Sequence, residues 1–151
     1  MRRTFGRVGA GLLASGLMFS NLAAEPRAQP KQEPVAETKL LMEGLALPNF
    51  RGLDRNLRQK PAEADAWGFL RGQALLVAET GNLLMLRPPK SGGQDAWNAN
   101  AAQLRESATR LARAAAERDY ERSRASLAEL ANTCNRCHQT FRVNVRIPPK
   151  E

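Results

Sequence analysis

Histidine and cysteine are scarce in this chain of 151 residues, which contains one histidine and two cysteines. A structural zinc site needs four ligands, so a carboxylate would have to complete any set built from these three side chains. A thioredoxin-like dithiol needs alternating strands and helices around it, and the sequence shows no convincing strand pattern. Both kinds of site are therefore disfavoured.

A hydrophobic run long enough to cross a bilayer is also missing. The uncharged apolar stretch at residues 8–19 is shorter than the roughly 20 residues that a membrane helix needs. It follows Arg2, Arg3 and Arg7, which is the order of features in an export signal. We therefore expect residues 1–24 to be a signal peptide of a periplasmic protein, with no stable membrane span after cleavage. An uncleaved anchor is the alternative.

The charge is unbalanced but not concentrated. The formal net charge is +8, from 23 lysines and arginines against 15 aspartates and glutamates. A charge of this size can indicate nucleic-acid binding, yet Glu106 and Glu117 interrupt the arginine-rich run at residues 105–124. That pattern is typical of a solvated helix face with ion pairs, so we expect no nucleic-acid partner.

Prolines separate an N-terminal linker from the rest of the chain. Residues 25–35 combine prolines with charged and amide side chains, a composition typical of a disordered linker. The remaining length suits one domain. We expect that domain at residues 36–146 and a short C-terminal tail at residues 147–151.

Four stretches of the domain have apolar residues spaced by threes and fours, which predicts amphipathic helices. They cover residues 36–57, 62–86, 95–118 and 119 onward. The positions expected to face inward are Met42, Leu45, Ala46, Leu53 and Leu57, then Trp67, Leu70, Ala74, Val77, Gly81 and Leu84, then Trp97, Ala101, Leu104, Ala108, Leu111 and Ala115, and finally Leu127, Leu130, Cys134, Cys137 and Phe141. Stripes of this period suit helices that cross at about 20°. The expected fold class is therefore all-α, an antiparallel four-helix bundle.

Prolines and aspartates add local predictions. Pro48 falls inside the first helix, where it removes an amide donor and crowds the preceding turn, so we expect a kink or break there. Asp95 and Asp119 are suitable N-caps for the third and fourth helices. Pro148 and Pro149 are expected to stop the last helix.

Both cysteines and the histidine lie within one pentapeptide, Cys134-Asn135-Arg136-Cys137-His138. Two cysteines three apart, followed directly by histidine, form the attachment pattern for c-type haem. On a helix, residues three and four apart share a face, and here that face continues the leucine stripe into the core. The motif predicts one covalent haem c per chain, with thioether bonds to both cysteines and the histidine as the proximal iron ligand.

With this motif, the chain resembles the class II c-type cytochromes, the family of cytochrome c′ and its low-spin relatives. The resemblance rests on an exported precursor, four helices, a haem motif close to the C-terminus and the following pair Phe141-Arg142. It implies a haem held near the last helix, the first helix over the face opposite His138, and Arg142 near the proximal pocket. A solvated position at a helix end is the alternative for Arg142. We expect Trp67 and Trp97 to pack in the core.

The group on the other side of the iron decides between two functions. His138 is the only histidine, so a second imidazole from the same chain is excluded. The resemblance places the distal residue on the first helix, where Met42 lies near the middle of the inward face and Leu41 at its edge. A one-residue shift in the match exchanges the two. Ordinary core filling is the alternative role for Met42, and Met85 is the second candidate ligand.

Met42 as a thioether ligand predicts a low-spin electron carrier that works with redox partner proteins. Leu41 and Leu45 over an open iron instead predict a five-coordinate protein that binds nitric oxide or carbon monoxide. We do not expect an enzyme, because a peroxidase needs an acid–base group beside the iron and the sequence offers no suitable one. A helical interaction module without haem is the remoter alternative, and the resemblance implies that a homodimer could form through the first two helices.

Overall fold

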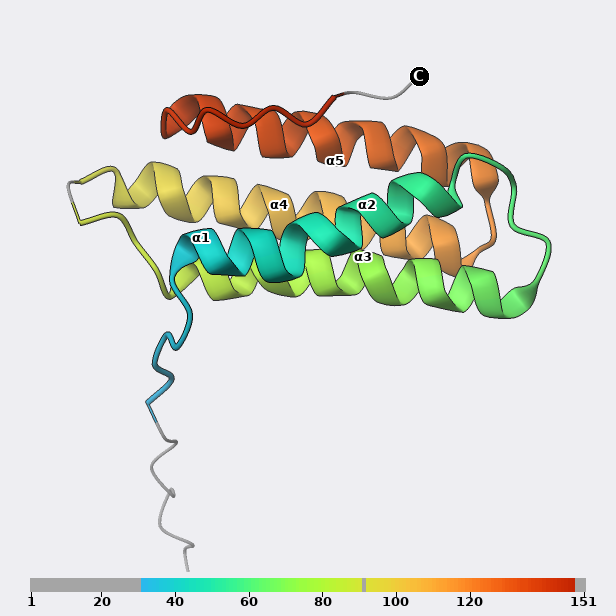
Figure 1. Cartoon of the computed structure of the whole chain (residues 1–151), viewed down its shortest axis with the longest axis horizontal. Coiled ribbons are helices and arrows are strands. Elements are labelled where there is room, and N and C mark those ends of the chain that lie inside the picture. Colours follow the sequence, from blue (N-terminus) through green and yellow to red (C-terminus); the bar gives the residue numbers. More distant parts are fainter. Residues whose placement is uncertain (1–30, 91, 149–151) are drawn as a thin grey trace, which may run out of the picture. The chain divides into compact units, whose positions relative to one another are not determined.

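The computed structural model describes residues 31–90 and 92–148, and its helices lie in one compact unit that begins at Gln32. They are α1 (Thr38–Leu41), the π-helical η1 (Met42–Ala46), α2 (Leu47–Asn56), α3 (Ala64–Met85), α4 (Gln94–Ala116) and α5 (Tyr120–Thr140). Because α1, η1 and α2 follow one another without a break, they form one rod. The described residues thus make four helical rods, with successive rods antiparallel, and contain no strand (Figure 1). The predicted all-α four-helix bundle is confirmed.

The rods pack in chain order. α3 lies along α4, α4 along α5, and α2 against α3 (Figure 1). The core consists largely of leucines and alanines, with Leu53, Leu70, Leu111 and Leu130 completely buried. Every inward position predicted for α3 is buried. The spacing of apolar residues therefore identified the packing face of that helix correctly.

Pro48 does not break the first rod, and the helical turn before it is wider than an α-helical turn. The proline lies in the first turn of α2, where the missing amide hydrogen is tolerated. In the preceding η1, the Leu47 amide donates to the Met42 carbonyl, a π-type bond. A proline ring crowds the carbonyl four residues earlier, and the wider turn makes room for it. The Asn49 side chain adds a hydrogen bond of 2.7 Å to the Leu45 carbonyl. The expected break at Pro48 does not occur, and the helix accommodates the proline through the wider turn ahead of it.

The two aspartates predicted as N-caps differ in outcome. Asp119 caps α5, because its side chain accepts a hydrogen bond of 3.0 Å from the Arg122 amide, and that prediction is confirmed. Asp95 does not cap α4. The N-cap is Gly93, whose φ of 78° is in the left-handed region that glycine adopts without strain. The cap prediction for Asp95 is wrong because the backbone of the preceding glycine sets where the helix begins.

α5 ends at Thr140, before the two prolines that were expected to stop it. The Arg142 amide donates to the Gln139 carbonyl at 3.2 Å, and the Val143 amide donates to the His138 carbonyl at 2.8 Å. This is the Schellman pattern of helix termination. Arg142 has a left-handed φ of 54°, so the chain turns out of the helix there. The prediction about the prolines is wrong because the backbone closes the helix first.

The predicted signal peptide, residues 1–24, lies outside the described residues, as does most of the predicted linker. The described part of that linker, residues 31–35, is not helical, and Val35 is almost completely exposed. Among the described residues, no helix combines the length and the apolarity that a membrane span requires.

Candidate cofactor site

The haem-attachment pentapeptide lies in the last turns of α5. Cys134 follows the buried Leu127 and Leu130 along the helix and packs against the core. Cys137 and His138 are half-buried. Both cysteines are free thiols. The last turns of α5 thus place two thiols and one imidazole at the same end of the bundle.

Burial keeps both thiols uncharged. It raises the pKa of the Cys134 thiol to about 12, and the neighbouring Cys137 acts in the same direction. Burial also raises the pKa of the Cys137 thiol above its usual value. A thiolate would lose solvation at these positions, whereas a neutral thioether would not. The surroundings of the sulfur atoms therefore suit a covalent product without charge.

One nitrogen of the His138 ring is engaged by the backbone. Nδ1 lies 2.9 Å from the carbonyl oxygen of Val145. A carbonyl oxygen only accepts, so Nδ1 carries the proton and donates, and the lone pair of a neutral ring lies on Nε2. A metal-ligating histidine typically donates its second ring N–H in this way. The imidazole is thus in the tautomer that leaves Nε2 available to an iron atom.

The residues after α5 supply that carbonyl. Residues 143–148, which we call the C-terminal strap, run back beside α5 (Figure 1). Asn135 holds the strap through two hydrogen bonds: its Nδ2 donates to the Ile147 carbonyl at 2.6 Å, and its Oδ1 accepts from the Ile147 amide at 2.8 Å. A residue between the two cysteines therefore fixes the segment that contacts the histidine.

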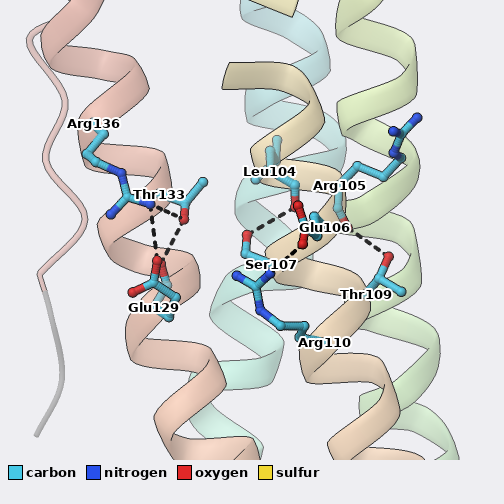
Figure 2. Close-up of polar contacts among 9 residues, drawn as sticks. All are labelled: Leu104, Arg105, Glu106, Ser107, Thr109, Arg110, Glu129, Thr133 and Arg136. Carbon is cyan, nitrogen blue, oxygen red and sulfur yellow. Dashed lines mark hydrogen bonds and ion pairs between the residues drawn. The ribbon is translucent and has the colours of Figure 1, made fainter. Parts of the chain in front are cut away.

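Arg136, the other residue between the cysteines, makes contacts along the helix instead. Its Nη2 donates to Glu129 Oε1 at 3.1 Å and to Thr133 Oγ1 at 2.9 Å, as Figure 2 shows. These contacts extend toward the start of α5. The two intervening residues thus have separate tasks, since Asn135 binds the strap and Arg136 binds its own helix.

The helix ends around the pentapeptide are linked to one another. The indole N–H of Trp97, in α4, donates to the Leu84 carbonyl of α3 at 2.7 Å. The same ring meets Phe141 edge-to-face, with centroids 5.0 Å apart. Arg87 donates to the Ala36 carbonyl at 2.8 Å, which joins the end of α3 to the start of the first rod. The end of the bundle that carries the pentapeptide is therefore a connected structure.

The first rod and α5 are joined at their opposite end. Tyr120 and Arg124, near the start of α5, each donate to the Leu57 carbonyl at 3.2 Å. Because the rods are antiparallel, the early residues of the first rod and the last turns of α5 lie at the same end of the bundle. Met42 and Cys134 therefore belong to the same region.

Burial on the first rod differs from the expectation. Leu41 is 7% exposed and belongs to the core, whereas Met42 and Leu45 are half-buried at its margin. Leu41 was expected at the edge and Met42 near the middle of the inward face, and that assignment is wrong. The helical pattern of the first rod is not uniform, because η1 starts directly after Leu41 and its wider turns change the register. Met85, at the end of α3, is also half-buried at the core margin.

Residues 93–142 match a family model described as Cytochrome C′. The match covers α4 and α5 and includes the pentapeptide and the pair Phe141-Arg142. In these two helices the chain is similar to the cytochrome c′ family. No curated protein and no solved structure matches it. The resemblance to class II c-type cytochromes is therefore confirmed through the last two helices.

Cytochromes c′ bind covalently attached haem c with iron, and this chain has one attachment motif for haem c, which lies within the matched residues. The residues present fit that cofactor. α5 provides two neutral thiols and an imidazole with Nε2 available, and the first rod provides half-buried apolar side chains at the same end. Among the described residues, no cluster of three or more histidine, cysteine, aspartate or glutamate side chains could hold a different metal ion.

Three residues near the end of α5 can be compared with the predictions. Arg142, expected near the proximal pocket, is exposed and occupies the left-handed position after the helix. Val145 and Asn135 were not predicted to matter, yet they place a carbonyl on His138 and hold the strap. Asn135 lies inside the motif and can form hydrogen bonds, but the sequence does not indicate that its partner is Ile147, twelve residues later. Trp67, by contrast, is 4% exposed and packs in the core as expected.

Proposed function

We propose that this chain is an exported electron-transfer cytochrome in which Cys134 and Cys137 form the thioether bonds and His138 is the proximal ligand. Met42 would be the ligand on the opposite side of the iron. When bound, the haem supplies the one-electron couple of its iron. The single observation that carries the axial assignment is the hydrogen bond from His138 Nδ1 to Val145, because it leaves Nε2 as the donor atom.

Burial on the first rod supports Met42 over Leu41. Leu41 packs into the core of the protein itself, so its side chain is already committed to protein contacts. Met42 is half-buried and borders the core, which leaves its flexible thioether able to turn toward a group beside α5. Histidine and methionine together raise the reduction potential. A pair of fixed ligands also holds the metal in both oxidation states, which suits electron exchange with redox partner proteins.

Apolar side chains around Met42 support a second candidate function. Leu45 lies half-buried in the same π-helical segment, and Leu41 is next to it. If Met42 only fills space, these side chains leave an apolar distal face and a five-coordinate iron. The protein would then bind nitric oxide or carbon monoxide, a role that fits the cytochrome c′ family. Neither candidate is an enzyme, since the chain's only histidine would be held as a ligand.

Optical spectra of the holoprotein distinguish the two functions. We expect a low-spin spectrum in the reduced wild type, slow reaction with carbon monoxide, and a high-spin spectrum in Met42→Ala with a lower reduction potential. Met85→Ala is the matched control and should keep the wild-type spectrum. A high-spin wild type that Met42→Ala leaves unchanged would reject the electron carrier and support the gas-binding protein.

Export is tested separately from the ligands. We propose cleavage after Ala24 and maturation in the periplasm, because the N-terminal sequence and a covalent haem motif agree on that compartment. Mass spectrometry of the exported protein should find a chain that starts at Glu25 and carries the added mass of one haem. A mature chain without that mass would contradict the thioether assignment whatever the spectra of other preparations are.

A further inference from the structure

Polar contacts contribute more than burial to keeping the C-terminal strap beside α5, since Ile147 is its only half-buried residue. Val143 is 47% exposed and Val145 is 53% exposed. Ordering a backbone residue costs about 1–2 kcal/mol, and such exposed side chains recover little of it by burial. The strap is therefore held mainly by its hydrogen bonds to Asn135 and His138. Loss of the Asn135 contacts should release it.

The Asn135 amide pairs with Ile147 as one peptide group pairs with another. It donates to the carbonyl and accepts from the amide of the same residue, so both polar groups of Ile147 are engaged. Two residues earlier, the carbonyl of Val145 meets Nδ1 of His138. Asn135 lies about one helical turn before His138, on an adjacent part of the helix surface. The anchor therefore fixes where the carbonyl stands relative to the ring.

We propose that the strap, anchored by Asn135, positions the His138 imidazole and lowers the reduction potential of the bound haem. The inference rests on His138 as the axial ligand, as proposed above, and is independent of Met42. Asn135 is a positioning residue, since it acts through the Val145 carbonyl and touches neither the iron nor its ligand atom. Arg136 is excluded from this role because its guanidinium is engaged by Glu129 and Thr133 (Figure 2).

The direction of the effect follows from the hydrogen bond. A carbonyl that accepts from Nδ1–H makes the imidazole a stronger electron donor at Nε2. A stronger donor stabilises the oxidised iron more than the reduced iron. Releasing the strap should therefore favour reduction. We expect a shift on the order of tenfold in the equilibrium between the two states, similar to the smaller changes in metal affinity that follow the loss of such outer contacts. For a one-electron couple, tenfold corresponds to a rise of about 59 mV.

Asn135→Leu tests the anchor without a change of charge. Leucine has a similar size but can form neither bond to Ile147, so we expect the reduction potential of the holoprotein to rise. Gln139→Leu is the matched control, because it removes an exposed amide from the same helix and leaves the strap contacts intact. Its potential should stay at the wild-type value. Equal potentials in wild type and Asn135→Leu would overturn the proposal.

Truncation after Arg142 is a second variant. It removes the strap, which should raise the reduction potential, and it also removes positive charge, which should lower the potential. The truncation removes Arg146 and Lys150 together with the side-chain carboxylate of Glu151, and it places the terminal carboxylate at Arg142, so the protein loses one positive charge in total. Loss of positive charge stabilises the oxidised iron and lowers the potential. A rise in the potential of the truncated protein would therefore reflect loss of the Val145 carbonyl in spite of the charge change. A fall as large as the charge alone predicts would count against the strap.

Proton NMR of the wild-type holoprotein tests the contact even if no variant folds. We expect the Nδ1 proton of His138 to exchange slowly with solvent, and to exchange faster in Asn135→Leu. Imidazole signals shifted by the iron, together with rapid Nδ1 exchange in wild type, would overturn the strap while leaving His138 as the ligand. Absence of an iron-bound imidazole signal would instead reject the axial assignment itself, so the two failures are distinguishable.

Discussion

Burial sets the protonation of the two cysteines at the end of α5, and the Val145 carbonyl sets the tautomer of His138. Cys134 is the clearest case, because desolvation raises its pKa to about 12 from an ordinary value of 9.0. The folded state therefore holds this proton more tightly than the unfolded chain. The resulting stability is present below about pH 9 and is lost as the pH rises toward 12. This applies only to protein without haem, since the thiols are otherwise consumed.

Alkylation of haem-free protein tests the state of the two thiols. Only the thiolate is nucleophilic, so at pH 8 we expect Cys134 to react at least about tenfold more slowly than in the unfolded chain, and more slowly than Cys137. Arg136 separates the cysteines, so trypsin places them on different peptides for mass spectrometry.

The same alkylation in guanidinium chloride is the control, and there both cysteines should react at similar rates. Equal and rapid labelling under native conditions, in a sample whose helical content is intact by circular dichroism, would show that Cys134 is not protected by the fold.

Different structural features start and end the helices. Some involve a single side chain, and others also determine where the following segment lies. α5 starts at an aspartate side chain, α4 at a left-handed glycine, and α2 follows a π-helical segment ahead of a proline. α5 ends at Thr140, and the left-handed Arg142 that follows turns the chain back toward His138. The start of α5 is therefore encoded by one side chain, whereas its end also determines where the strap lies.

Asp119→Ala should lower the free energy of unfolding by about 1 kcal/mol, because the Arg122 amide loses its acceptor. Urea denaturation of the holoprotein measures this. Asp119→Asn keeps an acceptor oxygen and should cost less than half as much. If both variants lost the same stability, the exposed ion pair between Asp119 and Arg122 at 3.8 Å, and not the cap, would be responsible.

The bundle depends on a close approach of α3 and α4. A Cβ on Gly81 would lie 2.7 Å from the Ala101 carbonyl oxygen and 2.9 Å from the Arg105 nitrogen. Both are backbone atoms of α4, so they cannot move aside without moving the helix. The glycine in the α3 stripe therefore permits the most extensive helix contact of the molecule.

Gly81→Ala should lower the free energy of unfolding by about 1–3 kcal/mol, because the added methyl group pushes α3 from α4. Gly72→Ala is the matched control on the same helix. A Cβ there meets nothing within 4 Å, and replacing an exposed helical glycine should stabilise by about 0.5–1 kcal/mol. Thermal or urea unfolding compares the two, and a neutral Gly81→Ala would contradict the close contact.

Much of the bundle was predictable because helix faces follow from periodic spacing along the chain. The stripe from Trp67 to Leu84 and the cap at Asp119 were both correct. The predicted cap at Asp95 was wrong because a helix can begin without a side-chain cap. Here the left-handed backbone of Gly93 starts α4 two residues earlier. The prediction that Met42 is more buried than Leu41 was wrong, because the π-helical turn changes which residues of the first rod face inward.

Local order along the chain was enough to indicate four helices, an inward stripe and a pentapeptide with both thiols and the imidazole on one helix face. Those features depend on residues three or four apart, whose relation a helix fixes by itself. The folded chain alone determined that Val145 meets His138, that Asn135 holds Ile147 and that Arg142 leaves the helix. These contacts join residues on the two sides of the turn at Arg142. The direction of that turn depends on backbone angles and packing, which cannot be read from the spacing of residues along the sequence.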